Sequence, residues 1–146
     1  MHKRPILILS SGEDDDLETI IFGARLASRT KSKLVIIYVI EVDLVLPVTA
    51  DLDSEVQRAE DLLRRLKTDA DYNNNLIDTQ LLQGREKGTA LVDEALAQDA
   101  EAIVVSVDYD RRLGGFDISD DTRYILEHAN CAVWLVRPPL GNSLGA

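Results

Sequence analysis

Four short apolar runs along the chain predict buried strands. They are rich in β-branched residues and contain no polar interruption; they comprise Ile6 to Leu9, Leu34 to Ile40, Ala102 to Val105 and Ala132 to Val136. Continuous apolar strands are typical of a parallel sheet that helices cover on both faces. A fifth run, Leu76 to Leu82, alternates with polar residues and predicts a half-exposed strand near a sheet edge.

Between these runs, apolar residues recur at the spacing of amphipathic helices. The four segments that show this pattern are Leu17 to Ala24, Val56 to Ala70, Leu91 to Leu96 and Tyr124 to Ala129. Their starts carry capping signals, because short polar side chains can accept hydrogen bonds from the free N–H groups of a first helical turn. These signals are Asp15 with Glu18, Ser54 with Gln57 at capping-box spacing, and Asp117 or Ser119 before the last helix.

Strands and helices therefore alternate along the whole chain. This order predicts an α/β fold with a single open, doubly wound, five-stranded parallel sheet of Rossmann-like type, in the order 3-2-1-4-5, with helices on both faces. We expect residues 1–146 to form one domain and residues 138–146 to be a loose tail. A ligand would bind where the strand order reverses, beside residues 10–16 and 106–119.

Composition and charge narrow the range of partners. The chain has 26 acidic and 16 basic residues, a net charge of −10, and 45% hydrophobic residues, which suffice for a sizeable core. Such acidity disfavours nucleic acids and anionic membrane surfaces, and the longest apolar run, Leu34 to Ile40, is too short to span a bilayer. Cys131 is the only cysteine, so no intrachain disulfide is possible. We expect a cytoplasmic protein.

Four consecutive carboxylates, Glu13 to Asp16, follow the first strand. Oxygen ligands of this kind suit Mg²⁺ or Ca²⁺. However, adjacent residues that enter a helix point in different directions, so we favour a role in complementing the positive end of the helix dipole.

The segment after the fourth strand has a mixed charge. Arg111 and Arg112 could meet a phosphate, but several aspartates between Asp108 and Asp121 oppose one. No Gly-x-Gly-x-x-Gly follows any strand, and Gly84 to Thr89 lacks the order of a P-loop, so we interpret it as a strand-to-helix turn.

The signals for catalysis are weak. His128 lies on the predicted apolar face of the last helix, where a histidine is usually a packing residue. Cys131 follows three residues later, and sequence neighbours across a helix-to-strand junction rarely form a nucleophile and base pair. We therefore expect no catalytic site and no enzyme activity.

Several segments resemble the universal stress protein family. Ile6 to Glu13 is similar to the family's first strand and its Asp-Gly-Ser turn, and Leu34 to Glu41 is similar to its Leu-Leu-His-Val strand, with Tyr38 in place of the histidine. The most specific segment is Tyr124 to Arg137, which resembles Val-Leu-x-His-Ala-Pro-Cys-Pro-Val followed by a strand and an arginine.

The resemblance also identifies positions equivalent to the family's nucleotide pocket. Family members that bind ATP or AMP carry Gly-x-x-Gly, nine residues, then Gly-Ser or Gly-Thr, together with an Asp after the first strand and a backbone contact at the end of the second. The equivalent positions here are Ser106, Tyr109, Ser119 and Asp120 for the glycine motif, Ser11 for the Asp and Val39 for the backbone contact. Because side chains replace every glycine, the resemblance implies a member without ATP or another cofactor.

Three functions remain open. The first is a homodimeric stress-response or regulatory protein that pairs through Ala132 to Val136 and acts on unidentified protein partners, since an apolar edge strand invites aggregation unless it is covered. The second is ATP or AMP binding with Mg²⁺ and at most slow hydrolysis, through Arg111 and Arg112. The third is a phosphoacceptor or metal-binding role for Glu13 to Asp16. Receiver domains need an acceptor Asp after the third strand and a Lys after the fifth, and this chain has Gln83-Gly84 and Arg137-Pro138 at those places, so we rank this function last.

One apolar segment, Val42 to Val48, lies outside the predicted elements. It could cover one end of the pocket or the dimer seam, and we favour an ordinary packed loop.

Overall fold

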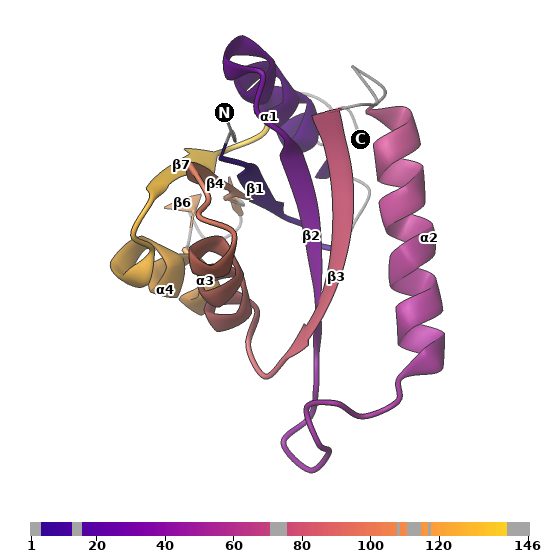
Figure 1. The fold of residues 1–146 in the computed structure, drawn as a ribbon. Helices are drawn as coiled ribbons and strands as arrows, with labels where there is room; N and C mark the ends of the chain where they lie inside the picture. The colour runs from indigo at the N-terminus through magenta and orange to yellow at the C-terminus, as the bar shows by residue number, and fades with distance from the viewer. Residues whose placement is uncertain are drawn as a thin grey trace.

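A computed structural model describes residues 4–12, 16–70, 76–107, 109–110, 115–116 and 118–139. Five strands form one parallel sheet in the order β3-β2-β1-β4-β7, which confirms the predicted topology (Figure 1). The strands are β1 (Ile6–Leu9), β2 (Leu34–Glu41), β3 (Ile77–Gly84), β4 (Ala102–Ser106) and β7 (Ala132–Val136).

Helices cover both faces of this sheet. The helices are α1 (Asp16–Thr30), α2 (Asp53–Asp69), α3 (Lys87–Ala97) and α4 (Asp120–His128). Helices α1 and α2 pack on one face, and α3 and α4 pack on the other. In the described part of the chain, no helix is long and apolar enough to cross a membrane.

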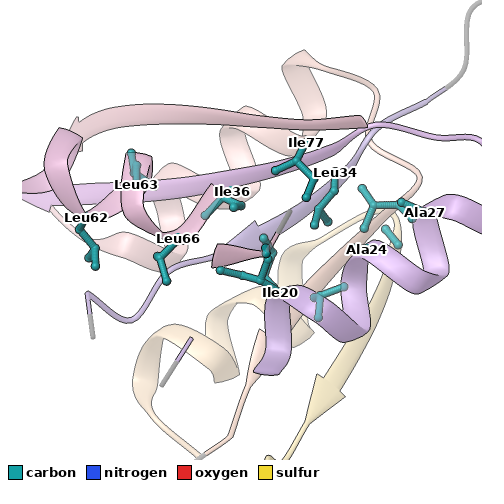
Figure 2. Close-up of a cluster of buried hydrophobic side chains, with 14 residues drawn as sticks. Ile20, Ala24, Ala27, Leu34, Ile36, Leu62, Leu63, Leu66 and Ile77 are labelled. Carbon is teal, nitrogen blue, oxygen red and sulfur yellow. The ribbon is translucent and has the colours of Figure 1, made fainter. Parts of the chain in front are cut away.

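Side chains that alternate along the strands build two cores. Ile8 and Ile36 point toward α1 and α2, whereas Leu7 and Ile37 point toward α3 and α4. Figure 2 shows the first core, in which Ile20 of α1 lies among side chains from the sheet and α2. Both faces of β1 are therefore buried, as its continuous apolar sequence predicts.

The two edge strands differ from the central ones. β3 is half-exposed along most of its length, as its alternating sequence predicts. β7 was predicted to be buried, but Ala132, Trp134 and Leu135 are exposed. The reason is positional, because β7 pairs only with β4 in the described chain and the sheet ends there.

The start of α2 also differs from its prediction. Leu52 is the N-cap residue and makes no side-chain cap, and Ser54 lies inside the helix, where its hydroxyl donates to Glu55. Gln57 donates to Asp61 one turn further on. The predicted capping box of Ser54 and Gln57 is therefore wrong, because the helix begins before Ser54 can serve as the cap.

The buried side chain of Ile36 tests this arrangement. Replacement of Ile36, which is fully buried between α1 and α2, by Ala should lower the free energy of unfolding by about 2–5 kcal/mol because it leaves a cavity. The exposed Leu96→Ala control should change it by less than about 0.5 kcal/mol. Equal losses in urea unfolding would contradict the assigned core.

Candidate functional site

Three predicted site residues lie at the carboxyl edge of adjacent strands. β1 lies between β2 and β4, so the strand order reverses there. Ser11 follows β1, Val39 lies in β2 and Ser106 ends β4. The registers Leu9↔Ile37 and Ile8↔Val104 bring all three backbones to the same edge of the sheet. Val39 is buried, Ser106 is half-buried and Ser11 is exposed.

A buried carboxylate organises the turn between β1 and α1. Asp16, the first residue of α1, is only 4% exposed. It accepts hydrogen bonds from the Ser10 hydroxyl at 2.6 Å, the Ser11 hydroxyl at 2.7 Å and the Ser11 N–H at 3.0 Å. Asp16 therefore holds the turn before α1, and it lies in the first helical turn, where the helix dipole favours a carboxylate.

The metal alternative receives no support from this turn. Glu13, Asp14 and Asp15 lie outside the described residues. Among the residues that are described, no group of three His, Cys, Asp or Glu side chains could hold a metal ion. The oxygens of Asp16 already accept hydrogen bonds from its own turn.

Tyr38 lies against the same turn. Gly12 has a φ of +88°, and a Cβ atom there would be 3.5 Å from Cε2 and from the hydroxyl of Tyr38. Glycine adopts this backbone conformation readily, whereas other residues would be strained. The Tyr38 ring therefore occupies the space in front of Gly12 on the side of the sheet that α1 covers.

The segment between β4 and α4 contains a short antiparallel strand pair that the sequence pattern does not predict. β5 (Tyr109–Asp110) pairs antiparallel with β6 (Gly115–Phe116), with Tyr109 opposite Phe116. Strands of two residues are too short to give a periodic signal. Arg111, Arg112 and Asp117 lie outside the described residues.

Ser119 caps the last helix, which confirms one of the two predicted caps, Asp117 or Ser119. Its hydroxyl accepts a hydrogen bond from the N–H of Thr122 at 3.1 Å. Asp120 begins α4 and is exposed. Ser119 and Asp120 are thus both held in a regular helix start.

Asp121 ties the start of α4 to the start of α3. Its Oδ1 atom accepts a hydrogen bond from the N–H of Gly88 at 2.9 Å. A Cβ atom on Gly88 would lie 2.8 Å from the carbonyl oxygen of Asp121, so only glycine permits this approach. Residues 84–89 form the expected strand-to-helix turn, and a carboxylate of the chain itself occupies one N–H group at the helix start.

The structure corrects the predicted position of His128. Its side chain is exposed, and its ring stacks on Tyr124 with centroids 4.1 Å apart. Its Nδ1 atom lies 3.0 Å from the Tyr124 carbonyl oxygen. Helical periodicity indicated an apolar face, but Thr122 and Ile125 are the residues that this helix buries.

Cys131 lies half-buried at the start of the last strand. Burial raises the pKa of its thiol, since the apolar surroundings disfavour the thiolate. A raised pKa makes a cysteine a poorer nucleophile at neutral pH because less thiolate is present.

The apolar loop at residues 42–52 is held at its ends and exposed at its tip. Gln83 donates to the carbonyl oxygens of Val48 and Ala50, at 3.1 Å each. Leu44 and Val45 are nevertheless 85% exposed. The expectation of an ordinary packed loop is therefore wrong for this tip, because its side chains have no sheet face to cover.

The fold and the reversed strand edge define a doubly wound α/β domain of Rossmann-like type. The model of the universal stress protein family matches residues 3–137, and the chain belongs to that family. No curated protein matches the chain.

Solved structures of the family share this fold. A universal stress protein from Archaeoglobus fulgidus is 18% identical with a TM-score of 0.75, covering 92% of this chain and 98% of its own. The universal stress protein UspA from Lactobacillus plantarum is 20% identical with a TM-score of 0.73, covering 94% of this chain and 99% of its own. A structure of the universal stress protein from Archaeoglobus fulgidus in complex with dAMP is 19% identical to this chain, with a TM-score of 0.71. It covers 92% of this chain and 98% of its own.

The close approach of α3 and α4 can be tested at Gly88. Gly88→Ala should destabilise the protein by about 1–3 kcal/mol, because the new methyl group meets the backbone of Asp121. Lys87→Ala, one residue earlier in the same turn, is the control and should change stability little. An unchanged denaturation midpoint for Gly88→Ala would contradict the described contact.

Proposed function

We propose that this protein is a homodimeric, non-catalytic regulatory member of the universal stress protein family that does not bind ATP and acts through protein partners. The observation that carries the proposal is the exposed apolar strand β7. Trp134 and Leu135 are 45% and 43% exposed at the end of the sheet.

A second copy is a suitable partner for this edge. The outer side of β7 offers a row of main-chain donors and acceptors beside apolar side chains, and such an edge promotes aggregation if it stays open. Pairing of two β7 strands about a twofold axis satisfies both the main chain and the side chains, and it closes the assembly at two copies.

The residues at the positions equivalent to the family's nucleotide pocket support the proposal that this protein does not bind ATP. Side chains replace glycine at Ser106, Tyr109 and Ser119, and Cβ atoms hinder the approach of backbone N–H groups to phosphates. Asp120 adds a carboxylate at the start of α4, where a phosphate would otherwise meet the helix dipole. Ser11 stands at the position that the family resemblance assigns to an adenine-binding Asp.

Binding of ATP or AMP with Mg²⁺ is the alternative function. It is favoured by the structures of relatives, since one family structure is a complex with dAMP and another with cAMP. Those ligands belong to those proteins, whose sequences are 19% and 16% identical to this one.

The chemistry of the candidate residues supports a non-catalytic role. The His128 ring is engaged by Tyr124, and the raised pKa of Cys131 keeps its thiol protonated at neutral pH. The lone cysteine is also compatible with a reducing, cytoplasmic location.

Dimerisation through β7 can be measured directly. At micromolar concentration, light scattering should give twice the chain mass of 16.2 kDa. Trp134→Glu should weaken the dimer by about tenfold or more, because two charges enter an apolar seam. Leu96→Glu, an equally drastic change at an exposed position of α3, should leave the dimer intact.

Because Trp134 is the only tryptophan, its fluorescence provides an independent measure of the same seam. Dilution should shift the emission to longer wavelength as the seam opens to water. A monomeric native protein, or a Trp134→Glu variant that dimerises like the native chain, would refute pairing through β7.

Nucleotide binding is tested separately by calorimetric titration with ATP, and with AMP, in the presence of Mg²⁺. We expect no saturable heat at nucleotide concentrations up to about 1 mM, the weakest affinity that such a titration readily detects. Saturable binding that Asp120→Asn strengthens would favour the alternative function over the proposed one.

A further inference from the structure

The loop between β2 and α2 carries an exposed apolar surface that is separate from β7. We call this surface the apolar tip; it consists of Leu44, Val45, Leu46, Pro47 and Val48. Leu44 and Val45 are 85% exposed, and Leu46 and Val48 are 39% and 41% exposed. Figure 1 shows the loop at the far end of β2 and β3, beyond the ends of the helices. An exposed apolar cluster with a polar border is typical of an interaction site.

Hydrogen bonds within the loop hold the apolar tip in one shape. The N–H of Leu46 donates to the Asp43 carbonyl oxygen, and the N–H of Ala50 donates to the Pro47 carbonyl oxygen, both at 2.9 Å. The Asp43 carboxylate also accepts a hydrogen bond from the N–H of Val45 at 3.1 Å. A loop that is already ordered loses less conformational entropy when a partner binds.

The end of β3 and the residue that follows it bring the two limbs of the loop together. Gln83 binds the limb after the tip, at the carbonyl oxygens of Val48 and Ala50. Arg85 binds the limb before the tip, where its Nη1 atom donates to the Val42 carbonyl oxygen at 3.3 Å. The residues that flank the tip on both sides therefore gather around its base.

The base of the apolar tip is acidic. Residues 41–53 contain no basic side chain and four exposed carboxylates, which we call the acidic collar: Glu41, Asp43, Asp51 and Asp53. Within the described residues, none of the four forms an ion pair. Arg85 lies at the same base and offsets one of these charges, so three negative charges remain.

Two members of the acidic collar lie against each other. A hydrogen bond with the Asp51 carboxyl, and repulsion between the two negative charges, raise the pKa of the Asp53 carboxyl. Such a pair is stabilised by a cation beside it, because an opposite charge favours the ionised form of both groups. The acidic collar is therefore complementary to Lys or Arg side chains.

This charge distinguishes three kinds of occupant for the apolar tip. An anionic membrane surface would repel the acidic collar. A second copy, docked tip to tip about a twofold axis, would bring two acidic collars together, and like charges across an interface are unfavourable. A protein surface with an apolar centre and a basic border matches both the apolar tip and the acidic collar.

We propose that the apolar tip binds a partner protein at an apolar surface bordered by Lys or Arg side chains. The apolar side chains supply the buried contact, and the acidic collar selects the partner by its charge. This inference rests on the proposed function only in that the protein acts through protein partners, and it is independent of pairing through β7.

The experiment uses three synthetic helical peptides of about 18 residues, or five turns. The first has a face of Leu bordered by Lys, and the second has Glu in place of every Lys. The third has the composition of the first, but its Leu residues are spread around the helix. Titration of the first into the ¹⁵N-labelled protein should shift the amide signals of Leu44 and Val45 saturably. The second should cause no shift, and the third should bind about tenfold more weakly or worse.

A variant of the apolar tip tests the apolar contact. Leu44→Ser combined with Val45→Ser changes two highly exposed side chains, so the fold should be unaffected. The variant should bind the first peptide about tenfold more weakly, or worse, because the apolar area that it buries is lost. Leu96→Ser, which removes a 64% exposed leucine from α3, is the matched control and should leave the affinity unchanged.

A variant of the acidic collar tests the charge. Asp51→Asn combined with Asp53→Asn should weaken binding of the first peptide about threefold to tenfold and reduce its dependence on salt. Glu18→Gln combined with Glu127→Gln removes the same net charge from exposed positions on α1 and α4. This control should bind the peptide as the native chain does.

Contrary results would overturn the proposal. These are equal binding of the Lys and Glu peptides, shifts that spread over the acidic surface away from the loop, or unchanged affinity in either loop variant. Shifts of Leu44 and Val45 on addition of phosphatidylglycerol or phosphatidylcholine vesicles would assign the apolar tip to a membrane instead. Broadening of the same signals with protein concentration alone would assign it to a second copy.

The apolar tip and the proposed dimer are tested separately. Trp134→Glu, which should weaken the dimer, should bind the first peptide with the affinity of the native chain. A monomeric protein whose apolar tip binds the peptide would refute pairing through β7 alone. A dimer whose apolar tip shows no selective binding would refute this inference alone.

Discussion

The pairing of β1 with β2 on one side and with β4 on the other is the constraint on which the rest of the structure depends. Because all three strands are parallel, the chain must return across the sheet after each one, and the helices that carry it back cover both faces. From β1 the chain adds β2 and β3 on one side, and after β3 it crosses back past β1 to add β4 and β7 on the other side, so the strand order reverses at β1. Both the candidate pocket and the buried turn at Asp16 follow from that single arrangement.

At this edge, carboxylates of the chain itself occupy helix N-termini. Asp16 accepts hydrogen bonds from the turn after β1 at the start of α1, and Asp121 accepts one from the N–H of Gly88 at the start of α3. A helix start with free N–H groups attracts anions. Asp121 satisfies one such group at the start of α3, whereas Asp16 binds the turn before α1, and both carboxylates would repel a phosphate. The proposed loss of ATP binding therefore has a physical basis that is separate from the replaced glycines.

The two edges of the sheet have different chemistry. β7 exposes Trp134 and Leu135, which suit a permanent, apolar pairing. β3 is half-exposed along most of its length and carries four polar side chains, Asp78, Thr79, Gln80 and Gln83. Polar recognition at an edge is more reversible, because its groups are well solvated when no partner is present.

The sequence by itself determined the strand order, the helix order and the family, because uninterrupted apolar runs such as Leu34 to Ile40 and helical spacing such as Leu17 to Ala24 are local signals of burial. Ser119 was also identifiable as a helix cap, since capping depends on residues three positions apart. The tertiary structure alone decided which apolar residues are exposed. Periodicity placed His128 and β7 inside, yet a residue is buried only if another element covers it. The contact between Asp121 and Gly88 was equally hidden, because the two residues lie 33 positions apart and meet only when α3 and α4 pack together.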